Sequence, residues 1–118
     1  MAASHFRVHG LTVVLDANGL TQHGPVDTVM TVEPVAERFR AFGWNVVDID
    51  GHDPHAVAEG LSSARALDGP SLVIARTIKG HHVSFMENDP LWHSRAMNDQ
   101  EYAAALAEIE NRGGHRAD

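Results

Sequence analysis

The stretch LTVVLDANGLTQHG, residues 11–24, places a short apolar run directly before a group of small and polar residues. Leu11–Asp16 is rich in β-branched residues and shows no polar alternation, which is typical of a strand that is covered on both faces of a parallel sheet. The residues from Asn18 to Gly24 would then lie beyond the carboxyl end of that strand. Because ligands bind at this end of open α/β sheets, the stretch indicates a binding site as well as a strand.

Two further apolar runs, residues 44–49 and 71–76, predict two more strands. A helix is expected between the first two strands, with Pro34 at its first position and Gly43 just past its end. Between the second and third strands, Asp53 is expected to cap a helix that has Pro54 at its first position. The buried stripe of this second helix is expected to consist of Val57, Ala58, Leu61, Ala64 and Leu67.

A last helix is expected after Asn98, which forms a capping box with Glu101 three residues later. Its apolar face is expected to be Tyr102, Leu106 and Ile109. Residues 17–32 and 77–97 are expected to be loops. The order predicts an α/β fold with a partial parallel sheet that another chain completes, because three strands leave two open edges. The domain is expected over residues 1–112, with a disordered tail at 113–118.

Composition narrows the classes of function. The 118 residues suffice for one domain, and the formal net charge of −7 with no basic block argues against nucleic-acid binding. The chain has no cysteine, which fits a reducing cytoplasm, and no secretory signal is expected at its amino terminus. No apolar run is long enough to span a membrane.

Several residues could bind a metal or a phosphate. The side chain of Asn18 and the backbone carbonyl of Leu20 are neutral oxygen donors of the kind that Mg²⁺ accepts together with a diphosphate, but a carboxylate must join them. The alternative is an ordinary Asn-Gly turn. Lys79 and His93 could contact a phosphate or move a proton, or they could be ordinary surface residues. His81 and His82 are adjacent, and adjacent residues rarely share one metal.

Six stretches together resemble the thiamine-diphosphate-binding domain of transketolase, in particular the amino-terminal subunit of split transketolases. They are LTVVLDANGL, GPVDTVM, EPVAERFRAFGWNVVDIDGHD, PSLVIARTIKG, VSFMENDPLWH and NDQEYAAALAEI, and they follow one another in the family's order and spacing.

The resemblance implies a cofactor, thiamine diphosphate, held through Mg²⁺ or Ca²⁺. It implies that Asn18 and the carbonyl of Leu20 bind the metal, with an aspartate from a Gly-Asp-Gly motif as the third protein ligand. It further implies that Gln22, Ile78, Lys79 and His93 line the cofactor, with His93 as the catalytic residue. Arg95-Ala96-Met97 stands where many members have Lys-Ala-Pro, which keeps the charge but not the shape.

The Gly-Asp-Gly segment and the pyrimidine-binding domain are absent from this sequence. The resemblance therefore implies partner subunits that carry both, and the transfer of a two-carbon ketol or related acyl unit from a ketose, sugar phosphate or acyl donor. Two alternatives stay open: a non-catalytic scaffold or regulatory remnant that assembles with such subunits, and a fragment of an ordinary two-subunit enzyme.

Overall fold

The computed structural model describes residues 1–113, which divide into two compact units. The sheet unit comprises residues 1–18 and 30–77, and the hairpin–helix unit comprises residues 19–29 and those from 78 on. Of the predicted tail, Gly113 is the last residue of a helix, and the remainder lies outside the described residues. None of the described helices is long and apolar enough to cross a membrane.

The sheet unit contains three parallel strands, β1 (Thr12–Ala17), β4 (Asn45–Asp50) and β5 (Ser71–Arg76), in the order β1-β5-β4. The last strand in sequence is therefore the middle strand of the sheet. Its register aligns Thr12 and Asn45 with Ser71, so all three strands end at the same level. The expected partial parallel sheet is confirmed.

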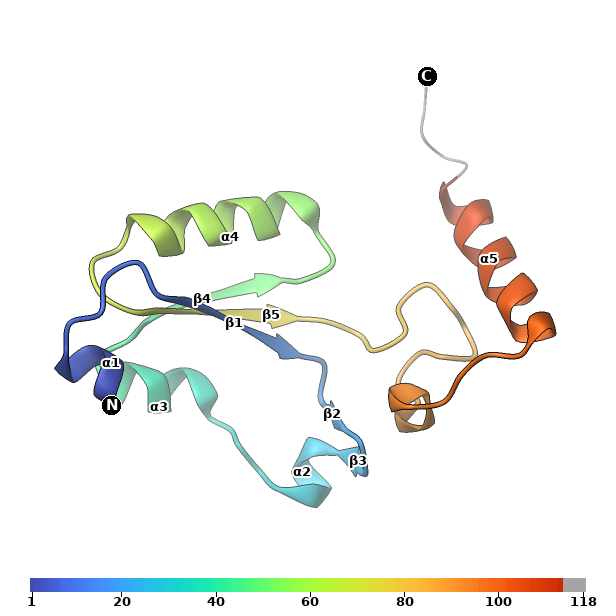
Figure 1. Cartoon of the computed structure of the whole chain (residues 1–118), viewed down its shortest axis with the longest axis horizontal. Helices are drawn as coiled ribbons and strands as arrows, with labels where there is room; N and C mark the ends of the chain where they lie inside the picture. The colour runs from blue at the N-terminus through green and yellow to red at the C-terminus, as the bar shows by residue number, and fades with distance from the viewer. Residues whose placement is uncertain (114–118) are drawn as a thin grey trace. The chain divides into compact units, whose positions relative to one another are not determined.

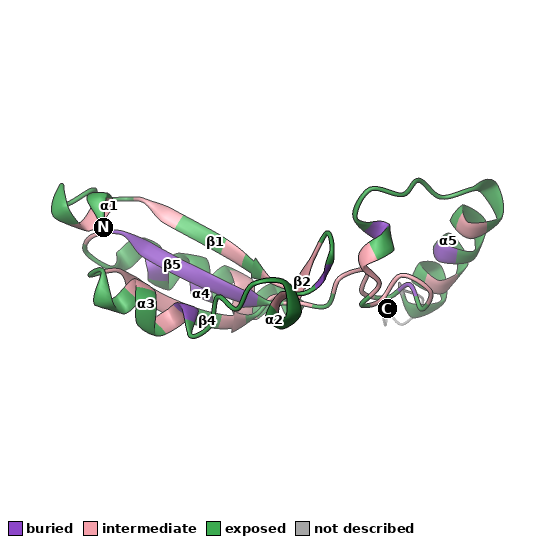
Figure 2. Cartoon of the chain, turned by 90° about the horizontal axis from the view of Figure 1, so that it is seen from below, coloured by how far each residue is buried: buried purple, intermediate pink, exposed green. Residues whose placement is uncertain are grey.

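Burial differs sharply between the middle strand and its neighbours (Figure 2). In β5, every residue from Ser71 to Ala75 is buried. In β1, by contrast, Val13 is 37% exposed and Val14 is 55% exposed. The prediction that the first strand is covered on both faces is therefore wrong for this chain, because β1 is an edge strand and little packs against its outer half.

Helices cover the two faces of the sheet, with α4 (Pro54–Ala66) on one side and α3 (Val35–Ala41) on the other (Figure 1). The connection from β1 to β4 passes over β5, and the connection from β4 to β5 runs back across the sheet in the opposite direction. Two right-handed crossovers that run in opposite directions across a sheet must place their helices on opposite faces. The strand order and the placement of helices on both faces therefore follow from the same two crossovers.

The face under α3 holds the main apolar cluster. Val35 packs with Leu72 and Ile74, and partly buried side chains surround them: Leu15, Ala17, Ala36, Phe39, Trp44 and Val46. Pro34 lies one residue before the helix rather than at its first position, because its ψ of 112° is extended. The carboxylate of Glu33 accepts the Val35 N–H at 2.8 Å and satisfies the first turn. Gly43, with φ of 78°, follows the helix end as expected.

The opposite face is built on small residues of α4. Asp53 caps this helix by accepting the His55 N–H at 2.9 Å, and Pro54 is its first residue, as predicted. The buried residues, however, are Gly60 and Ala64. The expected stripe is wrong at Ala58, Leu61 and Leu67, which are exposed. The helix lies so close to the strands that a Cβ on Gly60 would stand 2.8 Å from Ile49 Cγ2, and only small residues fit there.

The hairpin–helix unit contains β2 (Leu20–Thr21) paired antiparallel with β3 (Gly24–Pro25), followed by α2 (Val26–Val29). Residues 77–97, predicted to be loop, contain a 3₁₀ turn, η1 (Pro90–His93). The long helix α5 (Asp99–Gly113) begins with the predicted capping box, since Asn98 and Glu101 exchange hydrogen bonds at 2.9 and 3.0 Å. A short helix, α1 (Ala2–His5), opens the sheet unit.

The apolar face predicted for α5 is not buried within this chain. Tyr102 is 62% exposed, Leu106 is 41% exposed and Ile109 is 50% exposed, whereas Ala105 is buried. The spacing identified a helix face correctly but not its cover, because periodicity shows which residues share a face and not what lies against it.

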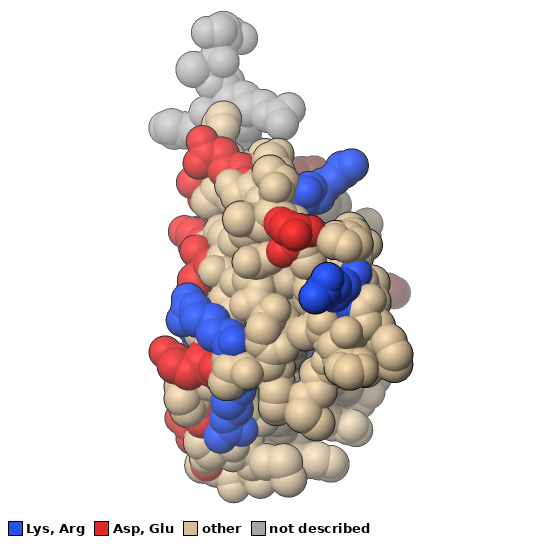
Figure 3. Space-filling view, turned by 90° about the vertical axis from the view of Figure 1, so that its left-hand side faces the viewer, with Lys and Arg blue, Asp and Glu red and all other residues tan. Residues whose placement is uncertain are grey.

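On the face seen in Figure 3, acidic and basic side chains are interspersed among uncharged residues.

We predict that Gly60→Ala destabilises the chain, although alanine normally favours helix. The new methyl group must displace Ile49, and overpacking of this kind costs roughly 1–3 kcal/mol. Urea denaturation of the purified variant measures the effect. The matched control is Ser62→Ala, an exposed position in α4, which should leave stability unchanged or slightly raise it. Equal behaviour of the two variants would contradict the close packing.

Candidate functional site

The strand order brings the carboxyl ends of β1, β5 and β4 side by side. Residues 16–18, 50–51 and 76–77 lie at this edge. They begin the three segments that follow the strands at this edge. Gly51 N–H donates to the Arg76 carbonyl at 2.8 Å, which continues the pairing of β4 and β5 past the last strand residue. The sheet unit therefore holds these three exits together.

Asp16 joins two of these exits. Its carboxylate accepts hydrogen bonds from the Asn18 side-chain amide at 3.3 Å and from the Thr77 hydroxyl on the neighbouring strand exit. Because the amide nitrogen of Asn18 points to Asp16, the amide oxygen is directed to the other side of the side chain. This local bond restrains the rotation of the Asn18 side chain.

The close approach of β4 to β5 at this edge requires glycine at position 51. A Cβ on Gly51 would lie 2.5 Å from Thr77 Cγ2 and 3.2 Å from the Arg76 carbonyl oxygen. Any side chain would therefore push on Thr77, whose hydroxyl binds Asp16. Gly51, Thr77 and Asp16 form a continuous set of contacts across the three strand exits.

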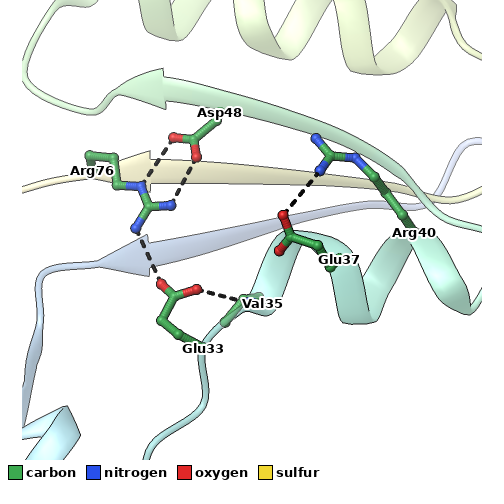
Figure 4. A network of polar contacts seen from close by, with 6 residues as sticks. All are labelled: Glu33, Val35, Glu37, Arg40, Asp48 and Arg76. Atoms are coloured by element: carbon green, nitrogen blue, oxygen red, sulfur yellow. Dashed lines mark hydrogen bonds and ion pairs between the residues drawn. The ribbon is translucent and has the colours of Figure 1, made fainter.

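An ion-pair cluster lies just behind this edge (Figure 4). Arg76 binds the carboxylate of Asp48 with two nitrogens, at 3.1 and 2.9 Å, and reaches Glu33 at 3.4 Å. The hydrogen bond from Val35 N–H, together with Arg76, holds the pKa of Glu33 below its ordinary value. The pKa of Arg76 is raised above its ordinary value, mainly because Arg76 donates hydrogen bonds to Asp48. The cluster ties the start of α3 to the ends of β4 and β5.

Of the six predicted site residues, Asn18 belongs to the sheet unit and five belong to the hairpin–helix unit: Leu20, Gln22, Ile78, Lys79 and His93. Leu20 lies in β2, opposite Pro25 in β3. The Thr21 hydroxyl binds the Gly24 carbonyl at 3.0 Å and accepts the His23 N–H at 3.1 Å. These bonds close a tight hairpin that presents Gln22 as an exposed residue at its tip.

Ile78 and Lys79 enter a compact turn. Ile78 is 38% exposed, and Lys79 is half-buried. Gly80 follows with φ of 70°, and a Cβ there would lie 2.5 Å from the Met86 carbonyl oxygen. The Lys79 carbonyl also accepts the Asn88 N–H at 3.0 Å. The backbone of Lys79 is therefore held in place from both sides of the turn.

His93 is an exposed residue at the end of η1, and its neighbour Trp92 is buried. Trp92 donates its indole N–H to the Phe85 carbonyl at 3.0 Å, and the Arg95 guanidinium lies over the Trp92 ring at 4.3 Å. Asp89 caps the turn by accepting the Leu91 N–H at 2.9 Å. Trp92 thus anchors the turn that presents His93.

The adjacent histidines take part in a separate contact. Glu87 accepts the His82 N–H at 3.0 Å and lies 3.2 Å from His81 Nδ1. These contacts, and above all the hydrogen bond from the His82 backbone N–H, hold the pKa of Glu87 below its ordinary value. Within residues 1–113, no three His, Cys, Asp or Glu side chains gather in a way that could hold a metal ion.

The chemistry of two predicted donors, taken singly, suits a hard cation. Asn18 and Leu20 offer an amide oxygen and a carbonyl oxygen, which suit Mg²⁺ or Ca²⁺. The carboxylate next to Asn18 is that of Asp16, and it accepts bonds from Asn18 and Thr77. Asp16 and Thr77 were not among the predicted site residues. The spacing Asp-x-Asn was the available signal for Asp16, whereas the contact with Thr77 spans 61 positions in sequence.

Comparison with known proteins gives a consistent result. Residues 1–111 match the family model described as transketolase, thiamine diphosphate binding domain. The 6-deoxy-6-sulfo-D-fructose transketolase subunit of Clostridium sp. (strain MSTE9) is 32% identical over 114 residues, covering 96% of this chain and 42% of that protein. An apulose-4-phosphate transketolase subunit of Phocaeicola vulgatus is 30% identical over 116 residues, covering 95% and 40%.

The fold is similar to that of a solved transketolase from Campylobacter jejuni. The TM-score is 0.86 at 24% sequence identity, over 92% of this chain and 17% of that one. At this identity the likeness establishes the α/β fold. This chain spans less than half the length of each of these relatives.

We predict that Asp16→Ala and Thr77→Val each lower the free energy of unfolding by about 1 kcal/mol, the usual net value of one hydrogen bond. Because both remove the same contact, the double variant should be no less stable than Asp16→Ala alone. Denaturant titration of the four proteins measures this coupling. Glu110→Ala, an exposed carboxylate in α5, serves as the control. Fully additive losses would contradict the Asp16–Thr77 bond.

Proposed function

We propose that this chain, which belongs to the transketolase thiamine-diphosphate-binding domain family, is one subunit of a transketolase-like enzyme divided among several chains. The enzyme would transfer a two-carbon ketol unit, or a related acyl unit, from a ketose, sugar phosphate or acyl donor to an acceptor. Support comes from two relatives that are themselves named as transketolase subunits and that share most of this chain's length.

One observation carries the proposal: Asn18 is held by Asp16 at the carboxyl end of the sheet, with its amide oxygen directed away from that bond. Two positions later, the carbonyl of Leu20 would be the second ligand of a Mg²⁺ or Ca²⁺ ion. A third, anionic ligand would come from the Gly-Asp-Gly segment of a partner subunit, which would also bring or recruit the pyrimidine-binding domain.

Thiamine diphosphate, when bound, would supply the nucleophilic carbon and the electron sink for cleavage of the donor's carbon–carbon bond. This chain's own residues would position the cofactor and the donor substrate and would neutralise phosphate charge. Ile78 would give an apolar wall, Gln22 a polar contact, and Lys79 a positive charge near phosphate oxygens. His93, presented by the turn that Trp92 anchors, would donate a hydrogen bond or a proton to an oxygen of the donor substrate.

The proposal places the chain in the cytoplasm, in a heteromer that is active only when its partner subunits are bound. It is tested by calorimetric titration of thiamine diphosphate with Mg²⁺ into this chain alone and into its complex with transketolase-like subunits that carry the Gly-Asp-Gly segment and the pyrimidine-binding domain. We expect binding by the complex and none by the isolated chain. Tight binding by the isolated chain would refute a shared site, and no binding by the complex would favour the scaffold role.

We predict that Asn18→Ala weakens Mg²⁺-dependent cofactor binding by the complex at least roughly tenfold, because one charge-assisted contact is worth about 1.5–3 kcal/mol. Circular dichroism should show an unchanged fold. The matched control, Asn111→Ala, changes an exposed asparagine of α5 and should bind as the unmodified chain does. If both variants retain the cofactor equally, Asn18 is only a turn residue.

We predict that His93→Ala lowers turnover by the complex roughly 10²-fold or more while cofactor affinity changes little, as expected for a residue that acts on the substrate in the transition state. Steady-state kinetics and cofactor titration separate the two effects. His55→Ala, an exposed histidine at the start of α4, is the control and should leave both unchanged. The reverse pattern, lost affinity with normal turnover, would make His93 a phosphate contact.

A further inference from the structure

We infer that Arg95 is a positioning residue for His93, acting from the segment that joins η1 to α5. This inference rests on the proposed function, in which His93 acts on the donor substrate, and it adds the side chain that holds His93 in place. Arg95 contacts neither the cofactor nor the substrate in this role. It acts by fixing Trp92, the neighbour of His93, to the amino-terminal cap of α5.

The position of His93 depends on the backbone of η1. His93 is exposed, and it is the last residue of this 3₁₀ turn. Its imidazole therefore stands wherever the end of the turn stands. A single 3₁₀ turn has poorer hydrogen-bond geometry than an α-helix and holds its own shape weakly. The side chains that anchor the turn therefore decide where His93 is presented.

Trp92 is the anchor of this turn, and contacts on both sides in sequence fix its ring. Its indole N–H donates to the Phe85 carbonyl at 3.0 Å, and the rings of Phe85 and Trp92 lie 5.5 Å apart. The Arg95 guanidinium lies over the Trp92 ring at 4.3 Å from its centre. The negative face of an indole attracts a cation, and tryptophan is the best aromatic partner for one. Phe85 thus holds the ring from the segment before η1, and Arg95 holds it from the segment after.

Arg95 is itself held by the start of α5. Its guanidinium forms a hydrogen-bonded ion pair with Glu101 Oε1, while Oε2 of the same carboxylate accepts the Asn98 N–H at 3.0 Å. The bond from Asn98, and then Arg95, hold the pKa of Glu101 below its ordinary value. The N–H groups of a guanidinium lie in its plane, so it can cover an aromatic face and donate sideways to a carboxylate at the same time.

The backbone between η1 and α5 gives little support of its own. Residues 95–98 form no helix or strand, and residues 93–100 are exposed. Exposed backbone of this kind opens easily. An exposed ion pair and one cation–π contact contribute little to global stability. The contacts of Arg95 with Trp92 and Glu101 therefore act locally, by fixing the end of η1 relative to α5 rather than by holding the fold together.

The first test is a cycle of variants in the complex with transketolase-like subunits that carry the Gly-Asp-Gly segment and the pyrimidine-binding domain. Arg95→Met keeps an unbranched apolar side chain but removes the charge. We expect it to lower kcat roughly tenfold, with cofactor affinity and the KM for the donor substrate unchanged. In a His93→Ala background, the same substitution should change kcat by less than about twofold, because Arg95 acts through His93.

Equal losses of kcat from Arg95→Met in both backgrounds overturn the inference. A raised KM with unchanged kcat also overturns it, because that pattern makes Arg95 a direct contact of the substrate. The matched control is Arg65→Met, which changes an exposed arginine of α4 and should leave kcat and KM unchanged.

Hydrogen exchange of the isolated full chain is a second test that needs neither cofactor nor activity. Leu91 N–H donates to the Asp89 carboxylate at 2.9 Å, and Trp92 N–H donates to the Asp89 carbonyl at 3.3 Å. Both amides should exchange roughly threefold faster or more in Arg95→Met, since an exposed cation–π contact corresponds to about a two- to fivefold change in an opening equilibrium. Amides in residues 71–76 of β5 should not change.

Glu101→Gln gives a check on the ion pair. Glutamine can still accept the Asn98 N–H and keep the cap, but it has no charge to hold Arg95. This variant should therefore speed exchange of the same two amides. Unchanged exchange in Arg95→Met overturns the inference even if the complex is active. An unmodified complex that neither binds thiamine diphosphate nor turns over overturns the proposed function instead, even if Arg95→Met speeds exchange.

Discussion

The burial of β5 between β1 and β4 is the constraint on which the rest of the structure depends. Five consecutive residues of this strand are buried, and helices cover both of its faces. Because β5 is last in sequence but central in space, the chain must cross the sheet and return, which places α3 and α4 on opposite faces. Both apolar layers of the sheet unit, one under each helix, follow from that placement.

The same placement creates the candidate site. With β5 in the middle, the exits of β1 and β4 are each one strand from Thr77 and Arg76, and contacts through Asp16 and Gly51 become possible. The sheet thus positions Asn18, whereas local turns present Gln22, Lys79 and His93. At the same time, β1 is left as an edge strand with Val13 and Val14 exposed, and Asn18 follows directly at its carboxyl end.

Much of this could be predicted from local patterns. The three strands, the caps at Asp53 and Asn98 and the family resemblance are confirmed, because each depends on residues close together in sequence. The failures share another cause. The buried stripe of α4 and the face of α5 were assigned from periodicity, which does not show what packs against a helix. Asp16 was overlooked because its decisive partner, Thr77, is brought to it only by the parallel pairing.

The sequence by itself determined which segments form strands and helices, where the helices begin, and to which family the chain belongs, since propensity, capping and motif spacing are properties of short stretches. Only the tertiary structure decided the strand order, the contact of Asp16 with Thr77, and the exposure of Val13 and Val14. Those features depend on the parallel pairing of strands that are far apart in the chain. That pairing is stabilised by the burial of apolar side chains from strands that are far apart in the chain, so no short stretch of sequence reveals it.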